Sequence, residues 1–546
     1  MPRVRPCETT LDGGNTKTDA CPLAGEKGRK AAAIALAVIV ALQAVLCIGA
    51  IVTKQGLFQD ESYTLFLTNG EFLYDLPADG QVYHGGEPYE SWVTVPTFLG
   101  ADYGQVIQNQ INDVHPPLHY ILLAALYSLF PGSWDPAIGL SLNAAAMCIV
   151  TVLSFFTARF LGVPRWMALA AAAVWAVSPA MVNDAVYLRM YGLLTLWFAA
   201  AAALAARIAS RRSCSVGEAV ALFLVTACGG LTQYFFLPYA FVLYLCVGIV
   251  LLLHREIAAG VRFAIGSIAG ALSVFLLFPA AFDHIFSGYR GVEALSRAAD
   301  GSSFVDFFVR DWRQLDTGNT GGVLILIAIV LIAAAAVSFL MCRKNADAKA
   351  SSGMCGWMSV GAYVSLAVAA VAFVTIIARV APYPSIRYVL SVQPVLQMCV
   401  FLPLAGLCLW LAKNRARQAL VAFAVVAVLI TGLGYSHGIK YWDQENDDVA
   451  ALAQENATFM GVWENPMMVE AFLPDATDYD TGVYFSSPES LGAFDFSQVD
   501  GGVTLIVQDG VDFAPYKEAF EAAAPGVRMT YVGDTIDHFD VYDVEL

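Results

Sequence analysis

Charged residues are scarce in this sequence. They make up 14% of its 546 residues, whereas hydrophobic residues make up 58%. A soluble globular chain carries about 25% charged residues. The apolar residues gather in uncharged runs of roughly 20, the length that crosses about 30 Å of hydrocarbon. This composition excludes an ordinary soluble protein and predicts a polytopic α-helical membrane protein.

Basic residues and cysteines are depleted in the C-terminal part. Residues 440–546 hold 22 acidic and 3 basic residues, whereas the remaining 439 residues hold 24 acidic and 27 basic ones. The net charge of −16 therefore resides in this last segment, which argues against nucleic acid or anionic lipid as its partner. None of the 11 cysteines lies there and none has a zinc-type spacing, so we expect them to serve packing.

Eleven apolar runs are long enough to be membrane spans. No small-residue cleavage site follows the first run, so we predict a retained span there and not a signal peptide. A further apolar run, residues 119–130, has only 12 residues, and we predict a juxtamembrane or re-entrant helix. The predicted spans are residues 31–52, 137–160, 165–183, 187–206, 216–234, 236–254, 261–282, 320–342, 357–378, 388–411 and 417–437.

Lysine and arginine predict the orientation, because these residues collect in cytoplasmic connections. With residues 1–30 as a cytoplasmic tail, 19 of the 30 Lys and Arg residues fall in cytoplasmic segments. An odd number of spans then places the C-terminus outside the cell. The predicted catalytic module covers residues 31–438, including a first outer loop at 53–136, and residues 439–546 follow as an extracytoplasmic domain.

The C-terminal domain reads as a small α/β unit. Its acidity and its lack of cysteine are typical of an extracytoplasmic domain of a prokaryote, so we predict a plasma-membrane protein. We predict that this domain folds independently and recognises the acceptor, and a passive appendage is the alternative. The predicted helices are residues 447–455 and 514–524, and the predicted strands are residues 503–508, 528–532 and 539–544.

Polar residues concentrate at the predicted outer ends of the spans. Each has an ordinary explanation, such as a helix end in water, a turn, or an arginine that reaches lipid headgroups. Their coincidence at one depth predicts a functional site, because ionisable residues at a membrane boundary are functional candidates. The set is Asp60, Glu61, Asp113, His115, Arg189, Tyr191, Gln233, Tyr234, Arg379, Arg387 and Tyr388.

These residue types suit one kind of chemistry. A carboxylate can take a proton from an acceptor hydroxyl. Arginines can bind a phosphate through paired hydrogen bonds and neutralise it as it leaves. Apolar walls between the spans would hold a polyprenyl chain. The combination indicates glycosyl transfer from a lipid-phosphate sugar.

Five segments resemble the GT-C membrane glycosyltransferases. The resemblance is to the family 39-like branch that includes protein O-mannosyltransferases and the aminoarabinose transferase of lipid A. The segments occur in family order, and the resemblance covers roughly residues 31–411. They read DESYTLFLTNG, DVHPPLHYILLAALYSLF, SPAMVNDAVYLRMYGLLTLW, LTQYFFL and SIRYVLSVQP.

The resemblance implies a role for individual residues. Asp60 corresponds to the catalytic base, with Glu61 as its neighbour, and His115 with Asp113 lines the same site. The arginines of the RMY and SIRY segments correspond to Arg189 and Arg387. A polyprenyl-phosphate monosaccharide would be the donor, used on the outer face with inversion.

Some members of the family bind a divalent metal, for which Asp60, Asp113 and His115 are possible ligands, and no other cofactor is implied. Two features depart from the family pattern, the insertion DLPADGQVYHGGEPYESW in the first outer loop and the Asn-Asp pair at 183–184. They leave open whether the acceptor is a glycan, a lipid or a protein.

A lipid-linked-sugar flippase or transporter is the alternative from another class, and an envelope scaffold is a third. A transporter would need polar residues at mid-bilayer. The predicted spans are nearly free of them away from their ends, which favours the enzyme.

Overall fold

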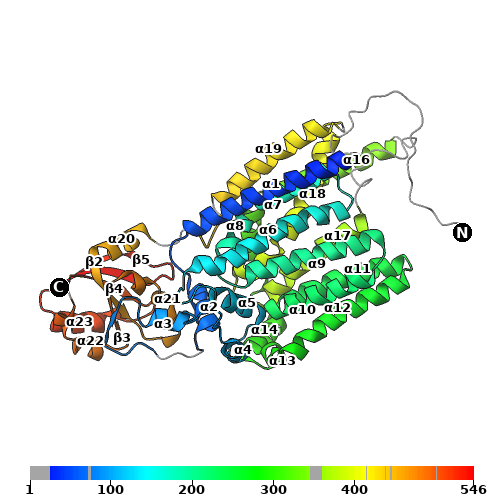
Figure 1. Cartoon of the computed structure of the whole chain (residues 1–546). Helices are drawn as coiled ribbons and strands as arrows, with labels where there is room; N and C mark the ends of the chain where they lie inside the picture. The colour runs from blue at the N-terminus through cyan, green and yellow to red at the C-terminus, as the bar shows by residue number, and fades with distance from the viewer. Residues whose placement is uncertain are drawn as a thin grey trace.

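The computed structural model describes residues 25–71, 76–344, 359–413, 415–436, 438–442, 446–499 and 501–546. Most of the predicted N-terminal tail lies outside this described part, as do Cys7, Cys21 and Cys355. The described chain forms a bundle of long helices with a mixed β-sheet at one end (Figure 1). The seven cysteines whose side chains are described are unpaired and buried or half-buried, as expected for packing residues.

Eight described helices are long and apolar enough to cross a membrane, or ten if two bent pairs each count as one span. Each of the eleven predicted runs overlaps a helix, but one of these helices, α10 (Val216–Thr232), has only 17 residues. The structure therefore does not establish the predicted number of eleven. The eight helices are α1 (Gly25–Val52), α6 (Pro136–Phe160), α9 (Tyr191–Arg211), α11 (Phe236–Leu253), α12 (Ile257–Leu277), α17 (Val360–Val380), α18 (Gln393–Leu411) and α19 (Ala416–Tyr435).

Two predicted spans are bent. The predicted span 165–183 consists of α7 (Arg165–Ala176) and α8 (Pro179–Val186), which meet at 50°. Pro179 stands at the start of α8, where its missing N–H costs no helical hydrogen bond. The other bent pair is α15 (Phe304–Thr320) with α16 (Leu324–Lys344).

Short helices lie between the membrane bundle and the sheet (Figure 1). The predicted juxtamembrane helix is α5, which follows two prolines and has ten residues. It is too short to span a bilayer. The short helices of this region are α2 (Gln59–Asn69), α3 (Tyr89–Val93), α4 (Tyr103–Asn112), α5 (Leu118–Tyr127), α13 (Ala280–Phe286) and α14 (Tyr289–Asp300).

The sheet has six strands in the order β1-β3-β2-β4-β6-β5. Strand β2 is parallel to both of its neighbours, whereas β1, β5 and β6 pair antiparallel. The predicted C-terminal strands correspond to β4, β5 and β6, but β2 and β3 were not predicted. The strands are β1 (Val82–His84), β2 (Asn456–Val462), β3 (Thr481–Phe485), β4 (Gly502–Val507), β5 (Arg528–Asp534) and β6 (Asp540–Glu545).

The sheet crosses the predicted domain boundary. Its edge strand β1 comes from the first outer loop and pairs with β3, about 400 residues later in the chain. One face of the sheet packs on α22 (Pro488–Gly492) and α23 (Phe513–Ala523). The other face shares a buried hydrophobic cluster with the short helices and the bundle, which includes Phe66, Leu188, Phe472 and Ile506. The C-terminal domain is therefore joined to the bundle by a common core, and its independent folding stays a prediction.

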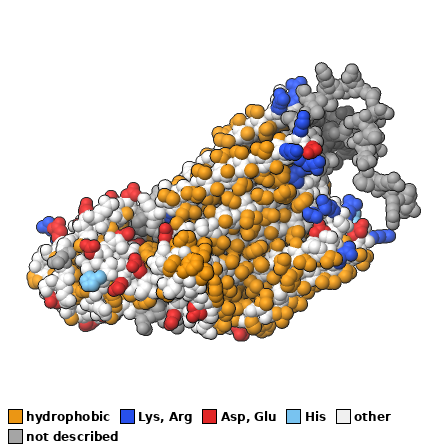
Figure 2. All heavy atoms as spheres, viewed as in Figure 1, with side chains coloured by type: hydrophobic (Ala, Val, Ile, Leu, Met, Phe, Trp, Pro, Cys, Tyr) orange, Lys and Arg blue, Asp and Glu red, His pale blue; other side chains and the backbone are white. Residues whose placement is uncertain are grey.

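The surface of the helical bundle is largely hydrophobic. Figure 2 shows hydrophobic side chains over the bundle, with Lys and Arg gathered at the end away from the sheet. Exposed Ile, Leu, Val and Phe side chains occur along α1, α11, α12 and α19. Such an apolar surface is stable only in contact with lipid or protein.

Candidate active site

Six residues separate α1 from helix α2, which carries two adjacent carboxylates in its first turn. Glu61 is fully buried, and its Oε2 accepts hydrogen bonds from Lys54 Nζ at 3.0 Å and from the Phe58 N–H at 2.9 Å. Its Oε1 accepts from the Leu188 N–H at 2.7 Å. Both oxygens of Glu61 are thus occupied in fixing the start of α2.

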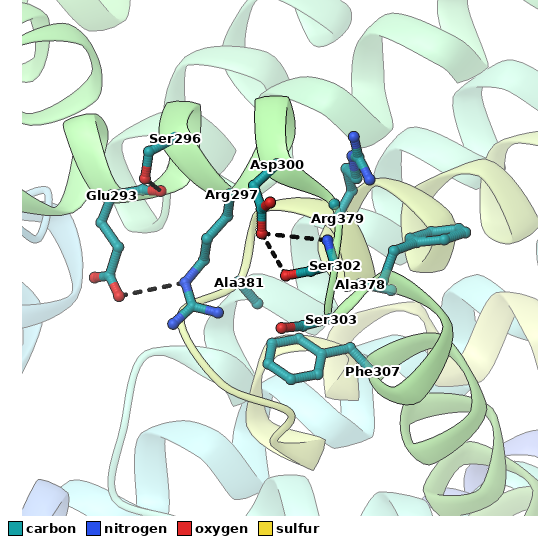
Figure 3. A pocket seen from close by; sticks show the side chains of 12 residues that line it. Glu293, Ser296, Arg297, Asp300, Ser302, Ser303, Phe307, Ala378, Arg379 and Ala381 are labelled. Atoms are coloured by element: carbon teal, nitrogen blue, oxygen red, sulfur yellow. Dashed lines mark hydrogen bonds and ion pairs between the residues drawn. The ribbon is translucent and has the colours of Figure 1, made fainter.

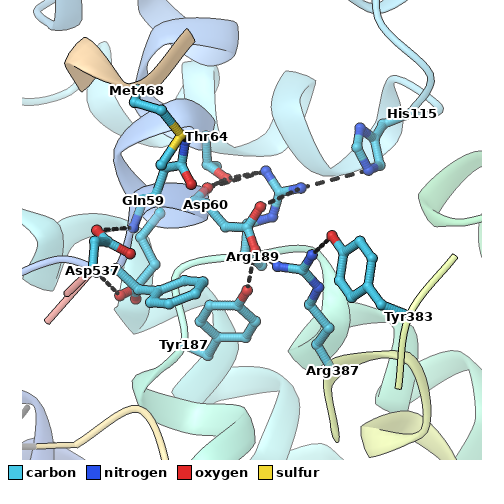
Figure 4. Close-up of polar contacts among 12 residues, drawn as sticks. Gln59, Asp60, Thr64, His115, Tyr187, Arg189, Tyr383, Arg387, Met468 and Asp537 are labelled. Atoms are coloured by element: carbon cyan, nitrogen blue, oxygen red, sulfur yellow. Dashed lines mark hydrogen bonds and ion pairs between the residues drawn. The ribbon is translucent and has the colours of Figure 1, made fainter. Parts of the chain in front are cut away.

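Asp60 faces a different environment, because successive helical residues point about 100° apart. Its side chain is 22% exposed and forms an ion pair with Arg387 (Figure 4). Tyr187 donates its hydroxyl to Asp60 Oδ2 at 2.9 Å. Asp60 Oδ1 lies 3.9 Å from Arg189 Nη2. One oxygen is therefore held by two donors, while the other has a looser contact.

Arg189 lies at the break between α8 and α9 and is almost fully buried, at 4% exposed. Its Nη1 donates to the backbone carbonyl of Asp60 at 3.1 Å and to Thr64 Oγ1 at 2.9 Å. Its Nη2 is 3.5 Å from His115 Nε2. A buried guanidinium needs such partners, and these tie α2 to the α8–α9 break and to the loop before α5.

Asp113 and His115 form a second pair on the far side of Arg189. Asp113 Oδ2 is 2.5 Å from His115 Nδ1. Burial alone would raise the pKa of Asp113, but the charges and hydrogen bond of His115, with Arg189, hold that pKa below its usual value. The carboxylate therefore fixes the His115 ring, which faces Arg189.

The possible metal ligands do not form one ligand set. Arg189 stands between Asp60 and His115, so a guanidinium occupies the region that a shared cation would need. Among the residues that the structure describes, no group of three or more His, Cys, Asp or Glu side chains is placed to hold a metal ion.

Arg387 is positioned by aromatic residues. It lies in a short 3₁₀ turn, Ile386–Tyr388, before α18. Its guanidinium is 5.1 Å and 5.2 Å from the ring centroids of Tyr383 and Tyr388, and it also donates to the Tyr383 hydroxyl. Tyr191 stacks on Tyr187, with 5.9 Å between centroids. Tyr388 therefore contacts Arg387, and Tyr191 contacts the residue that donates to Asp60. Aromatic rings attract a guanidinium and keep it in place.

Gln233 and Tyr234 join a neighbouring cluster. The Tyr234 hydroxyl is 3.0 Å from His284 Nδ1, and His284 Nε2 is 3.2 Å from the Ile111 carbonyl. Gln233 Oε1 accepts from the Tyr234 N–H at 2.7 Å. These contacts fasten the α10–α11 connection to α13 and α4, and no contact described for them reaches Asp60.

Arg379 does not contact the cluster around Asp60 and lies in a pocket of its own. It lines a pocket of about 390 Å³ at the turn between α14 and α15 (Figure 3). Its Nε donates to the Ala298 carbonyl at 2.9 Å, and its guanidinium lies against Gly301. Gly301 has φ +64°, and a side chain there would collide with Arg379. Arg379 therefore belongs to a different pocket from Asp60.

Several residues near Asp60 were not among the predicted site residues. Tyr187 is in the AVYLRMY segment, two residues before Arg189, so that segment could have indicated it. No short motif of the sequence indicated the residues after α19 that contact the site. Tyr441 stacks on Tyr187 at 3.7 Å, and the Gln59 N–H donates to Asp537 Oδ2 of the C-terminal domain at 2.9 Å.

No protein-family model matches the chain, and no curated protein matches it. Among solved structures, the chain is similar to the aminoarabinose transferase ArnT from Cupriavidus metallidurans bound to undecaprenyl phosphate (TM-score 0.43, 15% identity, 93% of this chain and 97% of that one). It is also similar to the oligosaccharyltransferase AglB from Archaeoglobus fulgidus in complex with an inhibitory peptide and a dolichol-phosphate (TM-score 0.40, 10% identity, 86% and 69%). Both are GT-C membrane glycosyltransferases. Both TM-scores lie below 0.5, so these likenesses carry no argument about the function of this chain.

Proposed function

We propose that this chain is an inverting glycosyltransferase of a prokaryotic plasma membrane. It moves a monosaccharide from a polyprenyl-phosphate donor to a hydroxyl of a glycan, lipid or protein at the outer face. One observation carries the proposal: a partly exposed carboxylate, Asp60, lies between Arg189 and Arg387 at the end of an apolar bundle. A base beside phosphate-binding cations, next to a lipid phase, is what this transfer requires.

Asp60 is the base of the proposed reaction. Its Oδ1 has only a 3.9 Å contact with Arg189 among the ion pairs described, so this oxygen can receive a proton from the acceptor hydroxyl. As the proton moves to Oδ1, the acceptor oxygen attacks the anomeric carbon from the face opposite the phosphate. The bond from that carbon to the phosphate oxygen breaks, and the electron pair leaves with the polyprenyl phosphate. Configuration at the anomeric carbon is inverted.

Arg387 binds the donor phosphate. Without donor it pairs with Asp60, and the rings of Tyr383 and Tyr388 keep its guanidinium in place. A phosphate that takes over this guanidinium releases Asp60 to act as a base, so donor binding prepares the carboxylate. Arg189 contributes positioning, because its hydrogen bonds to Thr64 and the Asp60 carbonyl fix the first turn of α2.

A flippase would use the same lipid-linked sugar but leave it intact. Transporter sites lie near the bilayer midplane, whereas this charged cluster is built at helix ends, from the start of α2 and the α8–α9 break. The position of the cluster therefore favours transfer over transport.

The test uses purified protein in vesicles loaded with a radiolabelled polyprenyl-phosphate monosaccharide, with an envelope extract as the source of acceptor. We expect label to move from the lipid to a water-soluble or polymeric product. The matched control is Arg297→Gln, which removes a guanidinium from the separate pocket of Arg379, and it should transfer normally. Label that crosses the vesicle membrane still attached to its lipid would contradict the enzyme and support the flippase.

A further inference from the structure

Residues 438–442, which we call the linker, lead from α19 toward the C-terminal domain and are fastened to α8. Asn183 of α8 accepts a hydrogen bond from the Lys440 N–H at 2.7 Å and donates one to the Gly438 carbonyl. Both partners are backbone groups of the linker. A single side chain of the bundle therefore fixes the course of the linker where it passes α8.

The linker is also fastened to the residues that connect α1 with α2. Trp442 donates its indole N–H to Thr53 Oγ1 at 2.8 Å. Lys54 Nζ donates to the Tyr441 carbonyl at 2.9 Å and to Glu61 Oε2 at 3.0 Å. The side chain of Lys54 is only 4% exposed. One nearly buried ammonium thus joins the linker to the first turn of α2.

The linker places an aromatic ring against Tyr187. The rings of Tyr441 and Tyr187 are both fully buried, and they stack with 3.7 Å between centroids and a 4° angle between planes. Phe58 lies edge-on to both, 6.0 Å from the Tyr441 centroid and 6.5 Å from the Tyr187 centroid. Because protein interiors are close-packed, these contacts leave the Tyr187 ring little freedom to turn.

Tyr187 holds the proposed base. Its hydroxyl points to Asp60 and donates to Oδ2 at 2.9 Å (Figure 4). The same carboxylate forms an ion pair with Arg387. In the proposed reaction the donor phosphate takes over Arg387, so Tyr187 is the donor that remains on Oδ2. A carboxylate held by Oδ2 keeps Oδ1 available for the proton of the acceptor hydroxyl.

We propose that Tyr441 is a positioning residue of the transfer reaction, which acts through Tyr187. The inference rests on the proposed function. The Tyr441 ring keeps the Tyr187 hydroxyl aimed at Asp60, and Tyr187 keeps the carboxylate in the orientation that receives the proton. Misplacement of a reacting group by about 1 Å can lower a rate by about 10²-fold. The linker thereby contributes to the chemistry of a site that is otherwise built from the bundle and its short helices.

The test measures single-turnover transfer and affinity for undecaprenyl phosphate in the purified full-length protein. Tyr187→Phe removes only the hydroxyl and should slow transfer about tenfold, the effect of losing one hydrogen bond to a charged group. Tyr441→Leu should slow transfer to a similar extent, and Tyr441→Phe should retain most of the rate because it keeps the ring. Affinity should stay near that of the wild type, since Tyr383 and Tyr388 still hold Arg387.

A double variant separates positioning from a general structural role. If Tyr441 acts through the Tyr187 hydroxyl, adding Tyr441→Leu to Tyr187→Phe should slow transfer no further than Tyr187→Phe alone. The matched control is Tyr239→Leu, because Tyr239 is a fully buried tyrosine that stacks on Phe198 with 4.0 Å between centroids. This control should lower the thermal unfolding midpoint, as loss of a buried ring does, and transfer at the wild-type rate.

A second variant tests the linker without changing either ring. Asn183→Ala removes both side-chain hydrogen bonds that fix the linker on α8. It should slow transfer in the wild type and leave the rate of Tyr187→Phe unchanged. This comparison decides the proposal even if Tyr441→Leu does not fold.

The outcomes of the two proposals are distinct. If the wild type binds undecaprenyl phosphate but transfers no sugar, the proposed function fails, and the role of Tyr441 fails with it. If the wild type transfers sugar and folded Tyr441→Leu transfers at the same rate, Tyr441 has no positioning role and the proposed function stands. Slowing by Tyr441→Leu that multiplies with the slowing by Tyr187→Phe would also overturn the inference, because the two residues would then act independently.

Discussion

Two adjacent carboxylates on α2 have opposite surroundings. Glu61 is enclosed and accepts three hydrogen bonds, one of them from the nearly buried ammonium of Lys54. Asp60 is partly exposed and pairs with two arginines of distant segments. A carboxylate with no exposed surface, such as Glu61, cannot receive a proton from substrate. We therefore assign the proposed chemistry to Asp60 alone, and Glu61 builds the turn that presents it.

We expect Glu61→Gln to destabilise the protein. The change leaves the Lys54 ammonium, 4% exposed, without its charged partner, and breaking a buried pair in this way costs about 3–5 kcal/mol. The thermal unfolding midpoint of the detergent-purified protein should fall clearly. Asp60→Asn provides the comparison, because it removes a partly exposed charge whose partner Arg387 keeps its contacts with Tyr383 and Tyr388, so the midpoint should fall less. Equal midpoints for the two variants would show that Glu61 does not hold α2 in place.

At the scale of elements, the insertion in the first outer loop acquires a role. It forms β1, which extends the C-terminal sheet beyond β3. Just before it, Asp79 accepts hydrogen bonds from the Ser486 N–H at 2.8 Å and from its hydroxyl at 2.7 Å. The Tyr83 and Tyr484 rings are 5.8 Å apart. The insertion thus ties the loop that follows α2 to the C-terminal domain.

Removing these bonds should loosen the edge strand alone. In Asp79→Ala, we expect the amides of β1 to exchange with deuterium faster, because the strand is three residues long and lies at the edge of the sheet. The amides of β2, at the centre of the sheet, should exchange as in the wild type. Unchanged exchange in β1 would show that Asp79 does not anchor the loop.

At the scale of the whole molecule, the sequence predicted where each membrane helix ends better than it predicted which neighbours the residues at those ends contact. Apolar runs located the candidate membrane helices, and the outer face that the polar residues at their ends indicate stays a prediction. Those residues are distributed around the bundle. Gln233, Tyr234 and Arg379 also lie near helix ends, but the contacts described for them are with other residues than Asp60. The angular position of a helix in a bundle depends on packing between distant segments, which periodicity in one sequence does not give. Asp60, Asp113, Arg189 and Arg387 do lie near one another, because the short motifs that carry them meet at adjoining helix breaks.

The sheet was harder to predict for a related reason. β1 has three residues, and its partner is about 400 residues away, so neither length nor local pattern indicated the pairing. β2 and β3 are largely buried, and parallel strands covered on both faces lack the alternation that marks a half-exposed strand. The common core of sheet and bundle follows from these contacts. It makes the C-terminal domain part of the structure that positions the site.

The most direct test of the central claim compares two quantities in Asp60→Asn. One is the single-turnover rate of sugar transfer from a radiolabelled polyprenyl-phosphate monosaccharide, and the other is the affinity for undecaprenyl phosphate. If Asp60 is the base and Arg387 binds the phosphate, the variant should bind at least as tightly as the wild type, because Arg387 loses a competing partner. Its transfer should be slower by about 10²–10⁴-fold. Transfer at the wild-type rate, or a loss of rate that only follows a loss of affinity, would contradict the claim.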